Sequence, residues 1–259
     1  MADCSIITEV RGPALWLTVD RQDVRNAYAP DTLRHLAEEI RDATKRDVRA
    51  VILTGAGSRS FSSGMDLRAL RDEPSEAVSD AVAEFHAAFD DPERVPIIAA
   101  VNGDANGGGF ETVLRCDLVI AAEHVMFGLP EVRHGLIPGG GATLLPARLP
   151  IVVAMELVIA GLAMPAQRAY DLGLVNRVVP ADALADVAQA FADSTAAGAP
   201  NAVATTRSLL WTTLHSGSDQ GWRDTKQALS DPRRRAEMAE GVAAFTEKRR
   251  PSWLRDVAK

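Results

Sequence analysis

Three short, mostly apolar runs recur in the first half of this chain, and they constrain its fold more than any other feature. The runs are AVILT at residues 50–54, IIAAV at residues 97–101 and LVIA at residues 118–121. The first two lead into glycine-containing loops, as expected where a buried strand ends. Helical stretches separate the runs, so the strands need crossover connections and pair largely in parallel. The sequence therefore predicts an α/β fold.

The rest of the chain indicates a β/α core followed by helices. Residues 5–10 and 14–19 alternate around an Arg-Gly-Pro turn and predict a hairpin, while residues 30–40 have helical spacing. We divide the chain into a core at residues 1–200 and a helical C-terminal region at residues 201–259. From about residue 150 the pattern predicts helices at residues 152–160, 166–172, 182–197, 201–215, 219–229 and 233–248.

Composition narrows the functional classes. The 259 residues are 47% apolar and 24% charged, which is ordinary for a globular protein. A formal charge of −7 disfavours a nucleic-acid partner, and the basic runs at residues 233–235 and 248–250 are interpreted as solvated helix faces. No stretch approaches ~20 uninterrupted apolar residues, so we expect no membrane partner and a cytoplasmic location. Cys4 and Cys116 lack the spacing of a disulfide framework or a zinc site, which favours a reducing compartment.

Two glutamates follow backbone that glycine or proline has made unusual. Glu111 ends the segment GGGFE at residues 107–111, and Glu131 ends the segment FGLPE at residues 127–131. Taken alone, Glu111 is a common dipole-stabilising residue of a first helical turn, and Glu131 is an ordinary turn carboxylate. Together they can place two carboxylates at one site, beside backbone N–H groups that stabilise negative charge on a substrate oxygen. The pattern predicts chemistry next to a carbonyl.

Two glycine-rich loops supply the candidate N–H donors. The loop at residues 55–66 contains neither of the phosphate-binding patterns G-x-x-x-x-G-K-[ST] and G-x-G-x-x-G. Its Met65 N–H can donate to an oxyanion, or the segment is a plain loop capped by Asp66. In the loop at residues 102–109, three consecutive glycines indicate that something approaches the backbone closely. If the two preceding strands are neighbours, the Gly108 N–H faces the same region as the Met65 N–H.

Other polar residues are weaker candidates. The histidines at positions 35, 86, 124, 134 and 215 lack the spacing of metal ligands and are predicted to be surface or packed residues. His134, close to Glu131, is held in reserve. Ser62 and Ser63 are not surrounded by a G-x-S-x-G elbow, which disfavours a serine hydrolase.

These motifs resemble the enoyl-CoA hydratase/isomerase family, also called the crotonase superfamily. The resemblance runs from residues 20–27 to residues 244–249. It implies a superhelix of ββα turns and a C-terminal helical region that mediates trimerisation, with a homotrimer or a hexamer of two trimers as the assembly. Its most specific segments are residues 51–55, 61–66, 99–103, 107–111, 116–117 and 127–131.

The same resemblance implies the roles of individual residues. The backbone N–H groups of Met65 and Gly108 would form the hole for the thioester oxygen. Coenzyme A would be bound only as part of the thioester substrate, with no permanent cofactor and no metal. Phe245 and Lys248 match C-terminal positions that can reach coenzyme A from a neighbouring subunit. The coenzyme A path within one chain would involve Val24, Ser63, Met65, Asp66, Leu67 and, near the phosphates, Arg68.

Both acid/base positions of the family are glutamates here, which favours an enoyl-CoA hydratase. The resemblance implies syn addition of water to a 2,3-enoyl-CoA, with Glu111 activating the water and protonated Glu131 supplying the proton to C2. Residues 147–150 and the ending Lys-Arg-x-Pro-x-Trp also resemble carnitinyl-CoA dehydratases. Met65 and the segments 104–106 and 142–145 depart from the common pattern and leave the acyl-chain preference open. The remaining alternatives are isomerisation, decarboxylation, and a non-catalytic acyl-CoA-binding or RNA-associated protein.

Overall fold

A six-stranded sheet forms the framework of the computed structural model, which describes residues 5–254 apart from the side chain of Leu70. The first two strands pair antiparallel as the predicted hairpin, and every later neighbour in this sheet pairs in parallel. The predicted parallel α/β arrangement is therefore confirmed. The strand order is β1 (Ile6–Arg11), β2 (Ala14–Val19), β3 (Ala50–Gly55), β5 (Ile97–Val101), β7 (Leu118–Ala122) and β10 (Arg177–Val179).

A second, four-stranded sheet turns this framework into a spiral. Its strands β4, β6 and β8 each follow a strand of the larger sheet, and helices α2 (Leu67–Asp72) and α4 (Gly108–Arg115) follow the first two of them. The ββα repeat implied by the resemblance is thus present. These strands were not expected from the periodicity, because alternation cannot be recognised over two or three residues. They are β4 (Ser60–Ser62), β6 (Asp104–Asn106), β8 (Met126–Gly128) and β9 (Met164–Pro165).

Helices cover both faces of the larger sheet. Helices α1 (Pro30–Ala43) and α3 (Ser75–Asp90) contact each other and bury their apolar faces in the main core. On the opposite face, α8 (Leu184–Ala196) packs on β2, β3, β5 and β7 through fully buried alanines such as Ala188 and Ala192. Short alanine side chains allow the helix to approach the sheet closely, and strand residues alternate between these two clusters.

The segment after residue 150 is not entirely helical, contrary to the expectation. Strands β9 and β10 interrupt it, between helices α6 (Ile151–Val158), α7 (Ala166–Asp171) and α8. Both strands add to the edge of a sheet. They are too short to carry a periodic signal, so their pairing was decided by the sheets that were already in place. Helix α5 (Gly139–Leu144) precedes this segment and contacts α4.

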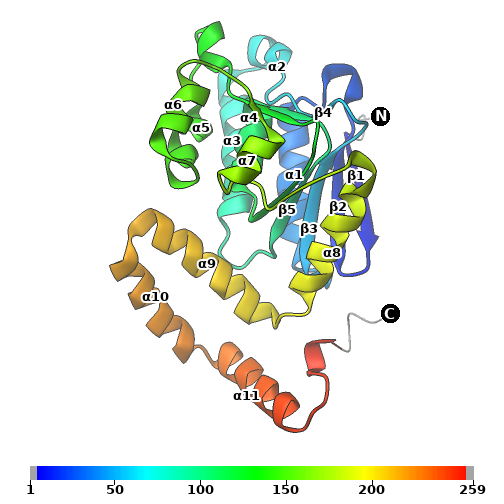
Figure 1. The fold of residues 1–259 in the computed structure, drawn as a ribbon, viewed down its shortest axis with the longest axis vertical. Helices are drawn as coiled ribbons and strands as arrows, with labels where there is room; N and C mark the ends of the chain where they lie inside the picture. The colour runs from blue at the N-terminus through cyan, green and yellow to red at the C-terminus, as the bar shows by residue number, and fades with distance from the viewer. Residues whose placement is uncertain (1–4, 255–259) are drawn as a thin grey trace.

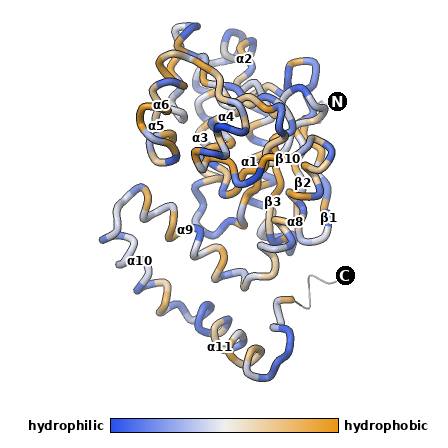
Figure 2. The backbone as a smooth tube through the Cα atoms, viewed as in Figure 1, coloured by the Kyte–Doolittle hydropathy of each residue, from blue (hydrophilic) through white to orange (hydrophobic). Residues whose placement is uncertain are grey.

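The C-terminal arm, defined as α9 (Pro200–Ser216), α10 (Ser218–Ser230) and α11 (Pro232–Thr246), extends away from the two sheets (Figure 1). Apolar positions lie along these helices at a distance from the core (Figure 2). Large apolar side chains on the arm are exposed, including Leu210, Trp222, Leu229, Met238 and Phe245. An exposed apolar surface of this kind suits burial between subunits. It supports the predicted oligomerisation region, while the trimer or hexamer stays a prediction.

A buried polar network helps to join the arm to the core. The Asp117 carboxylate receives hydrogen bonds from Arg94 at 2.6 Å and from the indole N–H of Trp211 on α9 at 2.8 Å. Arg94 is fully buried, so its charge is satisfied by this carboxylate and by backbone carbonyls. Trp211 therefore connects α9 to the core through this carboxylate.

The structure bears on the membrane spans, metal sites, cysteines and basic runs that were considered from the sequence. Within residues 5–254, no helix has both the length and the apolar character to cross a membrane, and no cluster of three or more His, Cys, Asp or Glu side chains is placed to hold a metal. Cys116 is a buried free thiol, and burial raises its pKa to about 12; Cys4 lies outside the described residues. The basic runs form ion pairs with carboxylates, for example Arg233 with Glu93 at 2.9 Å and Arg249 with Glu240 at 2.7 Å.

Candidate active site

The two glycine-rich loops meet at the start of α4. A Cβ on Gly64, which has a φ of +88°, would lie 2.6 Å from the Gly108 nitrogen, and one on Gly108 would lie 3.6 Å from the Met65 nitrogen. A Cβ on Gly109 would overlap the Ser62 carbonyl. The backbone of residues 62–65 thus lies too close to the triple glycine for side chains to fit there, which confirms the predicted close approach.

Met65 and Gly108 present backbone N–H groups that have no acceptor within residues 5–254. Tyr28 forms a parallel bridge with the loop, since its N–H donates to Gly64 O at 2.7 Å and its carbonyl accepts from Asp66 N at 2.8 Å. This pairing uses the groups on either side of Met65 and directs the Met65 N–H away from Tyr28. The Gly108 N–H is free because it is the first residue of a helix.

Asp66 is the N-cap of α2, as the plain-loop alternative predicted. Its side chain accepts a hydrogen bond from Arg68 N at 3.0 Å and forms an ion pair with Arg21 at 3.2 Å. Capping by Asp66 leaves the Met65 N–H unpaired, so the two alternatives weighed for this loop are compatible.

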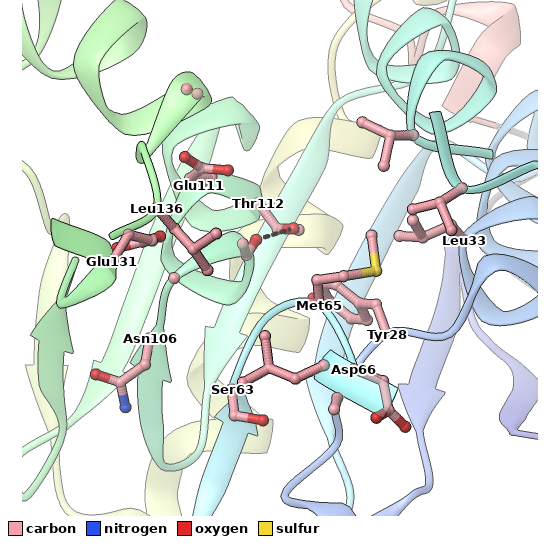
Figure 3. A pocket seen from close by; sticks show the side chains of 18 of the residues that line it. Tyr28, Leu33, Ser63, Met65, Asp66, Asn106, Glu111, Thr112, Glu131 and Leu136 are labelled. Atoms are coloured by element: carbon pink, nitrogen blue, oxygen red, sulfur yellow. Dashed lines mark hydrogen bonds between the residues drawn. The ribbon is translucent and has the colours of Figure 1, made fainter. Parts of the chain in front are cut away.

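A cavity of about 950 Å³ opens beside the two N–H groups (Figure 3). It brings together all predicted site residues except two. Phe245 and Lys248 do not line it: they lie at the end of the arm, where the Phe245 side chain is 88% exposed. Their role toward a neighbouring subunit stays a prediction. The predicted residues that line the cavity are Val24, Ser63, Met65, Asp66, Leu67, Arg68, Gly108, Glu111 and Glu131.

Glu111 lies in the first turn of α4 and is held by α5. Its Oε1 accepts a hydrogen bond of 2.7 Å from the Gly141 N–H. A Cβ on Gly140 would lie 2.9 Å from the Glu111 carboxyl carbon, so the glycine makes room for the carboxylate. The backbone donor fixes the orientation of the Glu111 carboxylate.

Glu131 begins a short 3₁₀ helix (Glu131–His134) directly after Pro130. Its Oε2 is buried and has no hydrogen-bond partner among the described residues. Burial, with a smaller contribution from the negative charge of Glu111, raises the pKa of Glu131 above its ordinary value. In Figure 3 both glutamates border the cavity on one side, opposite Met65 and Tyr28. The site thus contains one anchored carboxylate and one whose pKa is raised mainly by burial.

Several lining residues were missed from the sequence. Tyr28 and Asn106 belong to the cavity wall, and so does His86, which was predicted to be a surface or packed residue. The reserve candidate His134 also lines the cavity. Burial raises the pKa of Tyr28 to about 12, so the Tyr28 phenol stays protonated. The glycine run at residues 139–141 was the one visible signal for the contact with Glu111.

Two carboxylates and two backbone N–H groups that have no acceptor among the described residues lie in one cavity of a ββα spiral, an arrangement suited to acid/base chemistry beside a carbonyl. The sequence profile of the family described as enoyl-CoA hydratase/isomerase matches residues 13–256. The chain belongs to this family, whose members act on acyl-CoA thioesters, and is a crotonase-superfamily enzyme of the hydratase or dehydratase type.

Individual relatives agree with the family assignment. A carnitinyl-CoA dehydratase of Proteus mirabilis is 35% identical over 96% of this chain and 98% of its own. The crystal structure of an enoyl-CoA hydratase from Bacillus anthracis superposes with a TM-score of 0.86 at 32% identity, covering 95% of this chain and 98% of that one. An enoyl-CoA hydratase from Mycobacterium tuberculosis H37Rv gives 0.85 at 34% identity, with 96% and 98% covered. These solved structures confirm the crotonase fold.

Proposed function

We propose that this enzyme is an enoyl-CoA hydratase that adds water reversibly, in a syn sense, across the 2,3 double bond of an enoyl-CoA thioester. The observation that carries the proposal is the pairing of an anchored Glu111 with a buried, unpartnered Glu131 in one cavity. Water addition needs one group that accepts a proton and one that donates a proton at the same time, and these environments favour that division.

The thioester oxygen is proposed to lie between the N–H groups of Met65 and Gly108. Negative charge develops on this oxygen as water attacks C3, and a preorganised donor of this kind contributes about 3 kcal/mol to transition-state stabilisation. The positive end of the α4 dipole acts in the same direction. The two groups are supported in this role because they lie side by side and have no acceptor within residues 5–254.

The two glutamates complete the proton transfers. Ionised Glu111 removes a proton from water as the oxygen forms a bond to C3 and the π electrons of the double bond move toward the thioester. Protonated Glu131 then delivers its proton to C2, which forms the 3-hydroxyacyl-CoA. The two glutamates together hold one proton before and after the reaction. Transfer of this proton from Glu111 to Glu131 through solvent restores the starting state. Dehydration follows the same steps in reverse.

The coenzyme A part is proposed to pass the cavity wall formed by Val24, Ser63 and Leu67. Arg68 is exposed at this wall without a carboxylate partner for its guanidinium within residues 5–254, so it is available to the phosphates. Phe245 and Lys248 would complete this part of the site from a neighbouring subunit in a trimer or hexamer.

Loss of the enoyl-thioester absorbance on mixing with crotonyl-CoA tests the proposal. We expect rapid loss with the native enzyme and little with Glu111→Gln, which keeps a hydrogen-bond acceptor for Gly141 but cannot take a proton. Saturable binding of crotonyl-CoA without any loss of absorbance would contradict the assignment. Exchange of substrate hydrogen for solvent deuterium without hydration would indicate isomerisation or other enolate chemistry instead.

A second candidate is dehydration of a carnitinyl-CoA-like substrate. It is favoured by the relatives at about 35% identity, several of which carry the name carnitinyl-CoA dehydratase. The same two carboxylates would serve, because dehydration is the reverse of hydration. Turnover of crotonobetainyl-CoA faster than crotonyl-CoA would support this candidate.

A further inference from the structure

One wall of the cavity carries two polar side chains that the proposed hydration does not use. Arg115 comes from the last turn of α4, and His86 comes from α3. Both line the same cavity as Glu111 and Glu131. Apolar residues of α3, such as Val82 and Phe85, line the cavity as well. The cavity therefore has apolar residues of α3 as well as a cationic side chain in its lining.

The position of Arg115 relates it to the acyl chain. It follows Glu111 by four residues on the same face of α4, which corresponds to about 6 Å along the helix axis. The proposed thioester oxygen lies at the opposite, N-terminal end of this helix, beside Gly108. An acyl chain that continues past Glu111 along α4 would therefore approach Arg115.

The charge of Arg115 is only partly compensated. Its one carboxylate partner within residues 5–254 is Asp90, at 3.1 Å, and the Asp90 side chain is 69% exposed whereas that of Arg115 is 15% exposed. The Arg115 Nε is buried without a partner among the described residues. A guanidinium has five N–H donors, so this residue retains capacity for an anion.

Neither His86 nor the other carboxylates of the wall cancel this charge. Burial and the positive charge of Arg115 lower the pKa of His86, so the ring is neutral at pH 7 and can donate one hydrogen bond. Asp66 is paired with Arg21, and among the described residues neither Glu111 nor Glu131 forms an ion pair with Arg115. Asp23 lies with Val24 on the coenzyme A side of the cavity.

We propose that this cavity selects an enoyl-CoA whose acyl chain ends in a carboxylate, which Arg115 binds as an ion pair and His86 as a hydrogen-bond donor. This inference rests on the proposed hydration and specifies the substrate class. Methylene groups of the chain would contact Val82 and Phe85, while a carboxylate would replace water at Arg115. The same charge repels a trimethylammonium group, so it separates the two candidate functions.

Two substrates of equal chain length test the inference: trans-2-hexenedioyl-CoA, which ends in a carboxylate, and trans-2-hexenoyl-CoA, which ends in a methyl group. The readout is the ratio of their kcat/KM values for hydration. We expect the native enzyme to favour the carboxylate by roughly tenfold or more, because a charge-assisted hydrogen bond is available to this substrate alone. Arg115→Met should reduce the ratio to about one, and Arg115→Lys should retain part of it.

Asp90→Asn is the matched control, since it removes the exposed partner of Arg115 without changing a residue that lines the cavity. It should leave the ratio at least as high as in the native enzyme. A native ratio near one, or an unchanged ratio in Arg115→Met, would overturn the inference even though hexenoyl-CoA is hydrated. Failure to hydrate either substrate would overturn the proposed hydratase function itself.

Discussion

Glu111 and Glu131 follow similar glycine- or proline-containing segments, yet the fold gives them different surroundings. The α4 region supplies Glu111 with a backbone donor from Gly141 at 2.7 Å. The 3₁₀ region leaves Glu131 Oε2 buried without a partner among the described residues, and its pKa is raised mainly by that burial. One fold thus gives two chemically identical groups different environments, one anchored by a backbone donor and one buried without a partner, which is the difference that the proposed base and acid roles use.

The largest expected effect comes from removing either ionisable group. Glu111→Gln and Glu131→Gln should each lower kcat/KM for hydration by roughly 10²–10⁴-fold, since acid/base catalysis typically contributes this much. Binding of the thioester should change little, because the proposed oxygen site is made of backbone. Steady-state kinetics and equilibrium binding measure the two quantities. A folded variant with near-native turnover would show that the pair does not act as proposed.

The contact between α5 and Glu111 can be changed without touching the carboxylate itself. A Cβ in Gly140→Ala would lie 2.9 Å from the Glu111 carboxyl carbon, whereas a Cβ on Gly139 has no heavy atom within 4 Å. Displacement of a catalytic group by a fraction of an ångström to about 1 Å should lower kcat/KM by roughly 10- to 100-fold in Gly140→Ala. Gly139→Ala is the matched control and should remain close to native. Equal activities would mean that the position of Glu111 is not critical.

The pH dependence of kcat/KM tests the environments of Glu111 and Glu131 together. The active pair holds one proton, so activity should fall at low pH when both carboxyls are protonated and at high pH when neither is. The raised pKa of Glu131 places the alkaline decline above the ordinary glutamate value of about 4.3. Hydration and dehydration should share this profile, because the overall reaction consumes no proton. Residual activity of Glu131→Gln should lack the alkaline decline.

The smallest expected effect is on stability. A carboxyl whose folded-state pKa is raised favours folding most below its unfolded pKa, and this contribution is lost as the pH rises through the folded value. Glu131→Gln should therefore unfold at a higher temperature than the native protein at neutral pH, with the difference disappearing near pH 4. Thermal unfolding at the two pH values measures this. Glu111→Gln, which gives up a charge-assisted hydrogen bond, should show no such gain.

Local sequence patterns predicted the major elements because each carries its own periodicity. The hairpin, the strands β3, β5 and β7, and the helices of the C-terminal arm were expected and are present. The strands β4, β6, β8, β9 and β10 were not, since segments of two or three residues pair through their neighbours and not through their own alternation. The division at residue 200 and the assembly of subunits stay predictions, supported by the exposed apolar side chains of the arm.

The sequence by itself determined the α/β class, the family resemblance, and the segments that carry the two glutamates and the two candidate N–H donors. Glycine and proline indicate unusual local backbone conformations, so these segments could be recognised from the sequence alone. Only the tertiary structure decided that Gly141 holds Glu111, that Glu131 Oε2 is buried, and that Arg115 and His86 share their cavity. Burial and contact depend on residues far apart in the chain, and a protonation state follows from both.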